Sequence, residues 1–293
     1  MLQGFINIDK PAGITSFSVI KKLKPFFLGT KLGFVGTLDP IASGVLPVSI
    51  GFATRLTDEA HSSSKEYLAK GIFGKETDTY DSEGKIVKET SYDHIETKDL
   101  KVALESYKGK IKQSAPIFSA LKVNGSRMYD LARKGILVEP KVREVDLFSI
   151  ELINYSSPIF EIKISCGKGF YVRSLIHDIG KKLKSSSHMI ELRRTQSGVF
   201  CIDSSWQISS IENKLSNNLM DDLVIPPEVV LNNHKIINVD DLGAEHILSG
   251  TAIKLNNKYK EGDKLGFFYN QSLIAVGLFN NNMATPKKVI KNV

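Results

Sequence analysis

Residues 32–56 read LGFVGTLDPIASGVLPVSIGFATRL and contain a single acidic residue, Asp39, among four glycines. Pro40 follows this acid, and a proline disfavours the α region for the residue before it. The segment therefore predicts a loop that holds Asp39 extended and presents its carboxylate from a fixed position, while the glycines let another backbone segment approach closely. Taken alone, it fits an ordinary Asp-Pro turn at least as well.

The segments on either side of this loop predict both helices and strands. Helices are marked by apolar side chains at three- and four-residue spacing, and strands by short or alternating apolar runs. The predicted helices cover residues 16–24, 97–107 and 172–183, and the predicted strands cover residues 67–74 and 160–164. Because these elements do not follow a regular βαβ order, the sequence predicts an α+β fold.

A change of composition near Pro226-Pro227 predicts a domain boundary. The chain beyond it is rich in Asn and alternates short strands with Gly, Asn and Asp turns. We therefore expect a main domain over residues 1–228 and a small, mostly β module over residues 229–293. The polar stretch 213–218 predicts a loop.

The overall composition favours an ordinary globular protein with a polyanionic partner. Of the 293 residues, 42% are hydrophobic and 24% charged, and 39 Lys and Arg against 32 Asp and Glu give a net charge of +7. Such a charge suits RNA, although a solvated Lys-rich surface explains it as well. No apolar run long enough to span a membrane is present, and the opening MLQGFINIDKPAG lacks the pattern of a secretory signal, so we expect a cytoplasmic protein.

Cysteine and histidine usage argues against a disulfide framework and against a metal site. Only Cys166 and Cys201 are present, and the six histidines are scattered without ligand-like spacing. We therefore expect neither a metal nor another cofactor. Nothing in the sequence implies a protein partner, and we expect a monomer.

Six segments together resemble the TruB family of pseudouridine synthases in their order and spacing. They are KPAGITS (10–16), GTLDPIASGVLPV (36–48), KEYLAKGIFGKETDTYDSEG (65–84), PIFSALKVNGSRMYDLAR (116–133), GFYVRSLIHDIG (169–180) and ELRRTQSG (191–198). The resemblance implies a pseudouridine synthase fold with a mixed, mostly antiparallel sheet, followed by a PUA-like RNA-binding module. It also implies an isomerase that converts the T-loop uridine of tRNA, position 55, to pseudouridine.

The resemblance further implies three catalytic residues: Asp39 as the carboxylate, Tyr67 packed on the target base, and Arg173 paired with Asp39. The reaction breaks the bond from C1′ to N1 and remakes it to C5, so an ionised carboxylate can act on an electron-poor ribose or form a transient adduct. An arginine beside it favours the charged form. Whether Asp39 attacks C1′ or C6, or removes a ribose proton, is left open. Lys10 is expected to support the site from beneath.

Substrate contacts are also implied by the resemblance. Tyr171 and Leu192 are expected at the base pocket, and an insertion at about 115–143 is expected to grip the T arm through basic residues that include Lys122, Arg127 and Lys134. Phe34 occupies a position where many members have histidine. It can stack or fill the space left by a flipped base but cannot donate a hydrogen bond.

Two alternatives remain at this point. One is a non-catalytic RNA-binding or tRNA-folding protein on the same scaffold, against which the set Asp39, Tyr67 and Arg173 argues. The other is a pseudouridine synthase that acts on a different RNA, such as the box-guided relatives. The short chain without a long basic tail favours the stand-alone tRNA enzyme.

Overall fold

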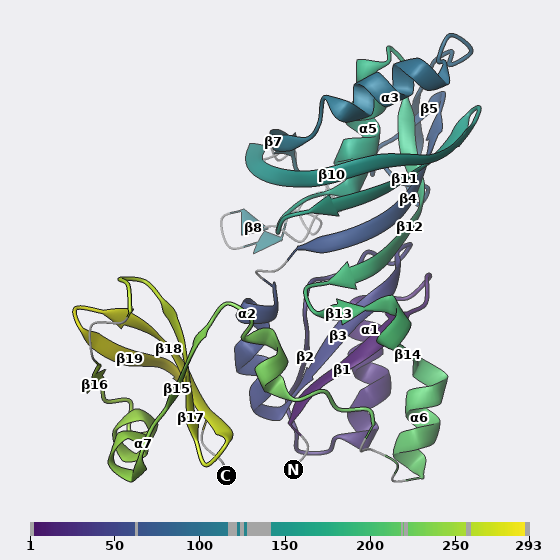
Figure 1. Ribbon diagram of the computed structural model, residues 1–293. Coiled ribbons are helices and arrows are strands. Elements are labelled where there is room, and N and C mark those ends of the chain that lie inside the picture. Colours follow the sequence, from purple (N-terminus) through teal and green to yellow (C-terminus); the bar gives the residue numbers. More distant parts are fainter. Residues whose placement is uncertain are drawn as a thin grey trace.

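The computed structural model describes residues 3–61, 64–116, 142–217, 219, 222–255 and 259–290, and the backbone of 122–123 and 126–127. A ten-stranded sheet dominates it (Figure 1). In spatial order its path runs β14 (Trp206–Gln207), β1 (Gly4–Lys10), β3 (Ser43–Ile50), β12 (Ser187–Ser197), β4 (Lys65–Phe73), β11 (Ile159–Cys166), β10 (Val142–Ser156) and β7 (Gly109–Ser114). β2 (Leu32–Phe34) pairs with β3, and β13 (Phe200–Cys201) pairs with β12.

The sheet has two halves that meet at a short parallel contact. β3 and β12 pair only through Ser43 with Arg193 and Gly44 with Arg194. Apart from this contact and the parallel pair β1–β14, the strand pairs of the large sheet are antiparallel. The prediction of an α+β fold with a mixed, mostly antiparallel sheet is confirmed.

Each half of the sheet carries its own helices (Figure 1). α1 (Ser16–Leu23) and α6 (Ile208–Ser216) lie beside β1, β3 and β14, whereas α3 (Thr97–Glu105) and α5 (Val172–Lys182) lie at the other end of the molecule, beside β10, β11 and β4. The Thr15 hydroxyl caps α1 by accepting a hydrogen bond from the Ser18 amide, as its position before the apolar pattern predicts.

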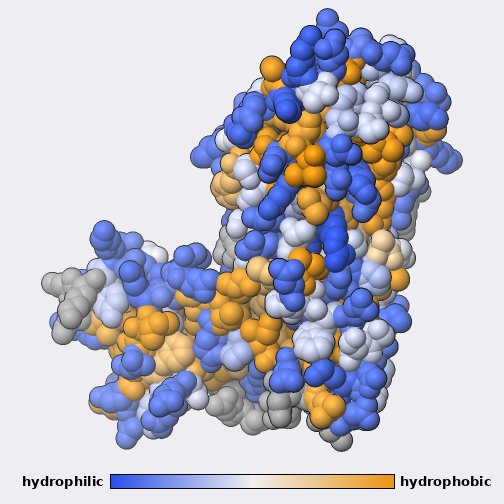
Figure 2. All heavy atoms as spheres, turned by 45° about the vertical axis from the view of Figure 1, so that its right-hand side comes forward, coloured by the Kyte–Doolittle hydropathy of each residue, from blue (hydrophilic) through white to orange (hydrophobic). Residues whose placement is uncertain are grey.

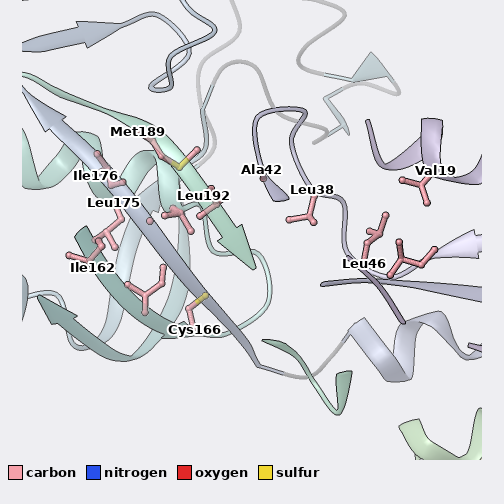
Figure 3. Packing of buried hydrophobic residues seen from close by; sticks show 14 of the residues in the cluster. Val19, Leu38, Ala42, Leu46, Ile162, Cys166, Leu175, Ile176, Met189 and Leu192 are labelled. Atoms are coloured by element: carbon pink, nitrogen blue, oxygen red, sulfur yellow. The ribbon is translucent and has the colours of Figure 1, made fainter. Parts of the chain in front are cut away.

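One hydrophobic core joins the two halves of the sheet. Leu38 and Ala42, which flank Asp39 in sequence, belong to the same buried cluster as Leu192 of β12 and Ile176 of α5. Figure 3 shows Leu38 and Ala42 facing, across the junction, the buried side chains of β11, β12 and α5. Burying two loop side chains in the core fixes the loop between them, because interiors are close-packed.

A second, five-stranded sheet forms the C-terminal part. Its order is β15 (Lys235–Asn238), β17 (Lys264–Tyr269), β18 (Ser272–Asn280), β19 (Met283–Val289) and β16 (Ile253–Lys254), with α7 (Asp241–Leu248) beside it. Apolar side chains of this sheet, Leu273 and Val276, share a buried cluster with Phe5 and Phe200 of the main body. Arg55 also donates a hydrogen bond to the Val289 carbonyl.

The remaining elements are short. They are η1 (Lys24–Phe26), η2 (Gly51–Leu56), α2 (Thr57–His61), β5 (Lys75–Thr77), β6 (Ile86–Glu89), β8 (Lys122–Val123), β9 (Ser126–Arg127), η3 (Ile202–Ser204) and η4 (Pro227–Val230). Figure 2 shows hydrophobic residues reaching the surface in patches along the upper half and near the junction with the C-terminal part. Over the ranges given above, no helix is long and apolar enough to cross a membrane.

The expected helices and strands are found close to their predicted positions, with one correction. Residues 213–216, predicted as part of a loop, form the last turn of α6. The polar Glu-Asn-Lys run hides a helical face on which Ile208, Ile211 and Leu215 are buried. Spacings of three and four residues place these side chains on one side, so tertiary packing overrides the polar composition.

Candidate active site

The loop that carries Asp39 connects β2 to β3 and is fixed from below by the start of α1. The buried Ser16 hydroxyl accepts a hydrogen bond from the Leu38 amide at 2.9 Å and donates to the Leu38 carbonyl at 3.1 Å. The Gly13 amide donates to the Pro40 carbonyl at 2.8 Å. These contacts hold the residues on both sides of Asp39, so its carboxylate is presented from a rigid loop, as the Asp-Pro sequence predicts.

Lys10 lies buried beneath this loop. Its ammonium donates hydrogen bonds to the carbonyls of Pro11 at 2.9 Å, Ile14 at 2.7 Å and Pro40 at 3.4 Å. Desolvation lowers the pKa of Lys10 to about 8, and the negative charge of Asp39 opposes this effect. Lys10 thus supports the peptide that follows Asp39, in agreement with the supporting position expected for it.

Arg173, in the first turn of α5, lies between two carboxylates. Its Nε is 3.0 Å from Oδ2 of Asp39, and its Nη1 is 3.2 Å from Oδ2 of Asp81. Nη1 also donates to the Thr79 carbonyl at 3.2 Å. Because the Arg173 side chain is only 6% exposed, these contacts fix the direction of the guanidinium and, through it, of Asp39.

The ionisation of Asp39 is set by opposing effects. Burial raises its pKa above the ordinary value, and the Asp81 charge adds to the rise, whereas the charge and hydrogen bond of Arg173 lower it. Without Arg173 the carboxyl would therefore hold its proton to a higher pH. Burial also raises the pKa of Tyr67, so its hydroxyl remains protonated at neutral pH.

Two neighbouring strands, β4 and β12, supply the floor of the site. Tyr67 and Arg194 are paired in the β4–β12 register, and the Arg194 charge opposes the rise that burial causes in the Tyr67 pKa. Arg194 is 1% exposed and donates from Nε to the Val45 carbonyl at 2.6 Å and from Nη2 to the Gly36 carbonyl at 2.9 Å. Gly44 (φ +102°) must be glycine, since a Cβ there would lie 2.2 Å from the Arg194 carbonyl oxygen.

A cavity of about 550 Å³ opens between these parts. This volume is within the usual range for small-molecule sites. Its lining includes Asp39, Tyr67, Tyr171, Arg173 and Leu192 together with the basic side chains of Lys65, Arg143, Lys168 and Arg194. A flat aromatic ring, a partly exposed carboxylate and several cations in one cavity suit a nucleotide with its phosphates.

The structure gathers five of the nine residues expected to act on or bind the substrate. Phe34 is not among the residues that line the cavity; it lies on β2, pairs with Val48, and packs partly buried against the main core. The side chains of Lys122 and Arg127, and the whole of Lys134, lie outside the described residues. Within the part of the chain the structure describes, no group of three or more His, Cys, Asp or Glu residues could hold a metal ion.

Sequence reasoning missed Asp81 and Arg194 as members of this site. Asp81 lies in the quoted segment TDTYDSEG, but nothing in the sequence showed that it would be buried against Arg173. Arg194 could have been found from alternation. Adjacent residues of a strand point to opposite faces, so one of Arg193 and Arg194 in the predicted motif had to face inward.

Comparison with known proteins agrees with this geometry. The N-terminal domain of the TruB family of pseudouridylate synthases matches residues 24–172, and the tRNA pseudouridylate synthase B C-terminal domain matches residues 173–232. The tRNA pseudouridine synthase B of Clostridium tetani is 38% identical over 94% of this chain and 95% of its own length. That of Haemophilus influenzae is 32% identical over 99% of this chain and 95% of its own length.

The fold is shared with solved structures of lower identity. A chain from the crystal structure of a Cbf5–Nop10–Gar1 complex superimposes with a TM-score of 0.75 at 24% identity, covering 98% of this chain and 84% of that chain. A chain from an H/ACA RNP bound to a substrate RNA containing 2′-deoxyuridine gives a TM-score of 0.73 at 22% identity, covering 98% and 84%. With the sequence matches, this establishes that the chain belongs to the TruB family of pseudouridylate synthases.

Proposed function

We propose that this protein isomerises the T-loop uridine of tRNA, position 55, to pseudouridine, with Asp39 as the carboxylate that acts on the nucleotide. The observation that carries the proposal is the Asp39 carboxylate, held 3.0 Å from Arg173 in the wall of a cavity that Tyr67 also lines. Relatives that are 32% to 38% identical over nearly the whole chain bear the name tRNA pseudouridine synthase B, which supports tRNA as the substrate class.

The chemistry needs a carboxylate that is ionised and fixed. Cleavage of the bond from C1′ to N1 leaves an electron-poor ribose or a covalent adduct, and Asp39 serves either route. Burial raises the pKa of Asp39, and Arg173 opposes this rise, so Arg173 favours the charged carboxylate. Positioning by Arg173 also limits the directions in which the carboxylate can approach the nucleotide.

Tyr67 and Leu192 fit the role of a base pocket. Both line the cavity, and they lie on the adjacent strands β4 and β12. A uridine inside a folded loop must leave its stack before it can react, and a flat ring beside an apolar side chain receives such a base. With the base in this pocket, the Tyr67 hydroxyl would lie near C5, which must lose a proton late in the reaction.

The insertion at about 115–143 is proposed to grip the T arm beside this cavity. Ser114 of β7 pairs with Val142 of β10, so the insertion leaves and rejoins the sheet at neighbouring residues. Arg143, Glu144 and Val145, which follow directly, line the cavity. Basic residues between these ends would thus meet RNA next to the flipped uridine. Residues 229–293 are proposed as a PUA-like module that adds RNA contacts.

The test is pseudouridine formation by an Asp39→Asn variant. Unmodified tRNA transcript is incubated with protein alone, and pseudouridine is mapped at each position. Wild type should modify the T-loop uridine, and Asp39→Asn should reduce the single-turnover rate at least about 10³-fold while tRNA binding stays within several-fold. Asp203→Asn, a change of an exposed acid in η3, is the matched control and should react normally.

Three results would contradict the proposal or part of it. Folded wild-type protein that binds tRNA but forms no pseudouridine would favour a non-catalytic tRNA-binding protein. Product at the wild-type rate in Asp39→Asn would remove Asp39 from the reaction. Product at another position, or only in another RNA, would retain the enzyme class but overturn the substrate.

A further inference from the structure

A tight turn between β5 and β6 provides the contacts that hold Arg173 from the side opposite Asp39. Two groups in this turn converge on Nη1 of Arg173: the Thr79 carbonyl at 3.2 Å and the Asp81 carboxylate at 3.2 Å. The second oxygen of Asp81 accepts hydrogen bonds from the Thr79 hydroxyl at 2.6 Å and the Glu83 amide at 3.1 Å. The conformation of the turn therefore sets the positions of these two groups that bind Arg173.

Tyr80, the residue between these two partners, has an unusual backbone conformation. Its φ is +62°, in the left-handed region that non-glycine residues with a bulky side chain avoid. Its carbonyl accepts a hydrogen bond from the Met189 amide of β12 at 3.0 Å. This conformation turns the chain so that Thr79 and Asp81, on either side of Tyr80, both face Arg173. A strained residue persists only where its surroundings hold it.

The Tyr80 side chain is held by His177. The two rings stack with centroids 3.8 Å apart and planes at 17°. The His177 side chain is only 4% exposed, and its ring nitrogens lie 3.0 Å from Oε1 of Glu76 and 3.4 Å from Oδ1 of Asp178. His177 follows Arg173 by one helical turn, so both side chains lie on the same face of α5 and contact the segment 76–81.

We propose that His177 and Tyr80 are positioning residues for the reaction: their stacked rings hold the turn in the left-handed conformation that keeps Arg173, and through it Asp39, in place. This inference rests on the proposed function for its catalytic meaning. The structural claim itself concerns only how Arg173 is held. Glu76 anchors the His177 ring through Nε2, and the stack fixes Tyr80 over α5.

Substitutions of Tyr80 separate the effect of the stacked ring from the effect of the backbone strain. Glycine adopts a positive φ without strain, so Tyr80→Gly relieves the backbone and removes the ring. Tyr80→Ala removes the ring but keeps the backbone strain. If the stack holds the turn, Arg173 in Tyr80→Ala becomes less well fixed and lowers the pKa of Asp39 less, whereas Tyr80→Gly should keep the turn. Tyr80→Phe retains the ring and should behave as wild type. Asn270→Gly, at φ +47° in the turn between β17 and β18, is the matched control for a new glycine.

The primary measurement is the midpoint of the Asp39 carboxyl titration, followed by carbon-13 NMR without RNA and assigned with Asp39→Asn. Tyr80→Ala and His177→Leu should each raise the midpoint by about half a pH unit or more, because Arg173 then stabilises the charged form less. Their single-turnover rates at saturating tRNA should fall roughly tenfold, as expected for a misplaced catalytic group. Binding of tRNA should not change.

The outcomes separate this inference from the proposed function. An unchanged Asp39 midpoint in a folded Tyr80→Ala protein would overturn the inference, whatever the activity of the wild type. If the variants raise the midpoint but the wild type makes no pseudouridine, the positioning role of the stack is retained and the proposed function is rejected. A lower melting temperature with wild-type midpoint and rate would mean that the stack stabilises the fold only.

Discussion

At the scale of single residues, the site depends on Arg173, which binds the carboxylates of Asp39 and Asp81. Burial and Asp81 both raise the pKa of Asp39, and the Arg173 charge is the strongest effect that lowers it. The proposed reaction uses Asp39 as an ionised carboxylate, so the rate should fall as pH drops through the Asp39 pKa. An acid limb above that of an ordinary aspartate is therefore expected in the pH profile of the single-turnover rate.

Replacing this arginine should move the acid limb upward. Arg173→Gln removes the positive charge and hydrogen bond that lower the pKa of Asp39, so the carboxyl group ionises only at a higher pH. We expect the limb to shift to higher pH and the plateau rate to fall roughly 10²-fold. The check is single-turnover kinetics across pH, with Arg193→Gln as control because Arg193 binds Asp9 at 2.8 Å outside the cavity lining. A limb that moves down, or not at all, would contradict this pairing.

Phe34 permits a clear choice between two roles. Its ring packs partly buried against the core and does not line the cavity, so Phe34→Ala should destabilise the protein by less than the about 3–5 kcal/mol lost for a fully buried phenylalanine. If the ring also occupies the space left by a flipped base when RNA binds, the single-turnover rate falls as well. Thermal melting beside kinetics on the folded variant measures both. A variant that melts lower yet reacts normally would leave Phe34 a packing residue only.

At the scale of elements, the basic insertion should act on binding rather than on chemistry. Arg127→Ala and Lys134→Ala each remove a cation from the segment proposed to grip the T arm. Each lost phosphate contact should reduce the slope of log affinity against log salt by about one, with little change in rate at saturating tRNA. Titrations at several salt concentrations test this. Unchanged slopes in both variants would place the grip elsewhere.

The sequence predicted elements better than it predicted contacts between them. α1, α5 and β11 follow from apolar spacing and a cap, because such signals are local. The pairing of Asp39 with Arg173 came from the family resemblance, since no local pattern links residues so far apart. Asp81 was missed for the same reason, and the end of α6 was missed because polar side chains masked its buried face.

At the scale of the whole molecule, the C-terminal sheet and the main body share a buried apolar cluster. Leu273 and Val276 contribute from one side and Phe5 and Phe200 from the other. Lys288 adds ion pairs to Glu59 at 3.0 Å and Asp58 at 3.1 Å, which are partly exposed and contribute little. The two parts are therefore expected to unfold together rather than one after the other.

Cooperative unfolding can be measured with the single tryptophan. Trp206 lies on β14 in the large sheet, so its fluorescence reports that sheet, whereas circular dichroism reports the whole chain. The two transitions should coincide. Leu273→Ala should shift both transitions together and lower the free energy of unfolding by about 2–5 kcal/mol. Leu242→Ala, at an exposed position of α7, should lower it by less than about 0.5 kcal/mol. An early transition seen by circular dichroism alone would show that the C-terminal sheet melts independently.

The pairing of Ser114 with Val142 has a consequence for how such enzymes diverge. Since the ladder between β7 and β10 closes where the insertion begins and ends, the chain between these residues can lengthen, shorten or change composition without altering the register of any strand of the large sheet. Loop length has only a weak entropic cost. Evolution can therefore vary the segment proposed to bind the T arm while the carboxylate, its arginine and the pocket strands are inherited unchanged.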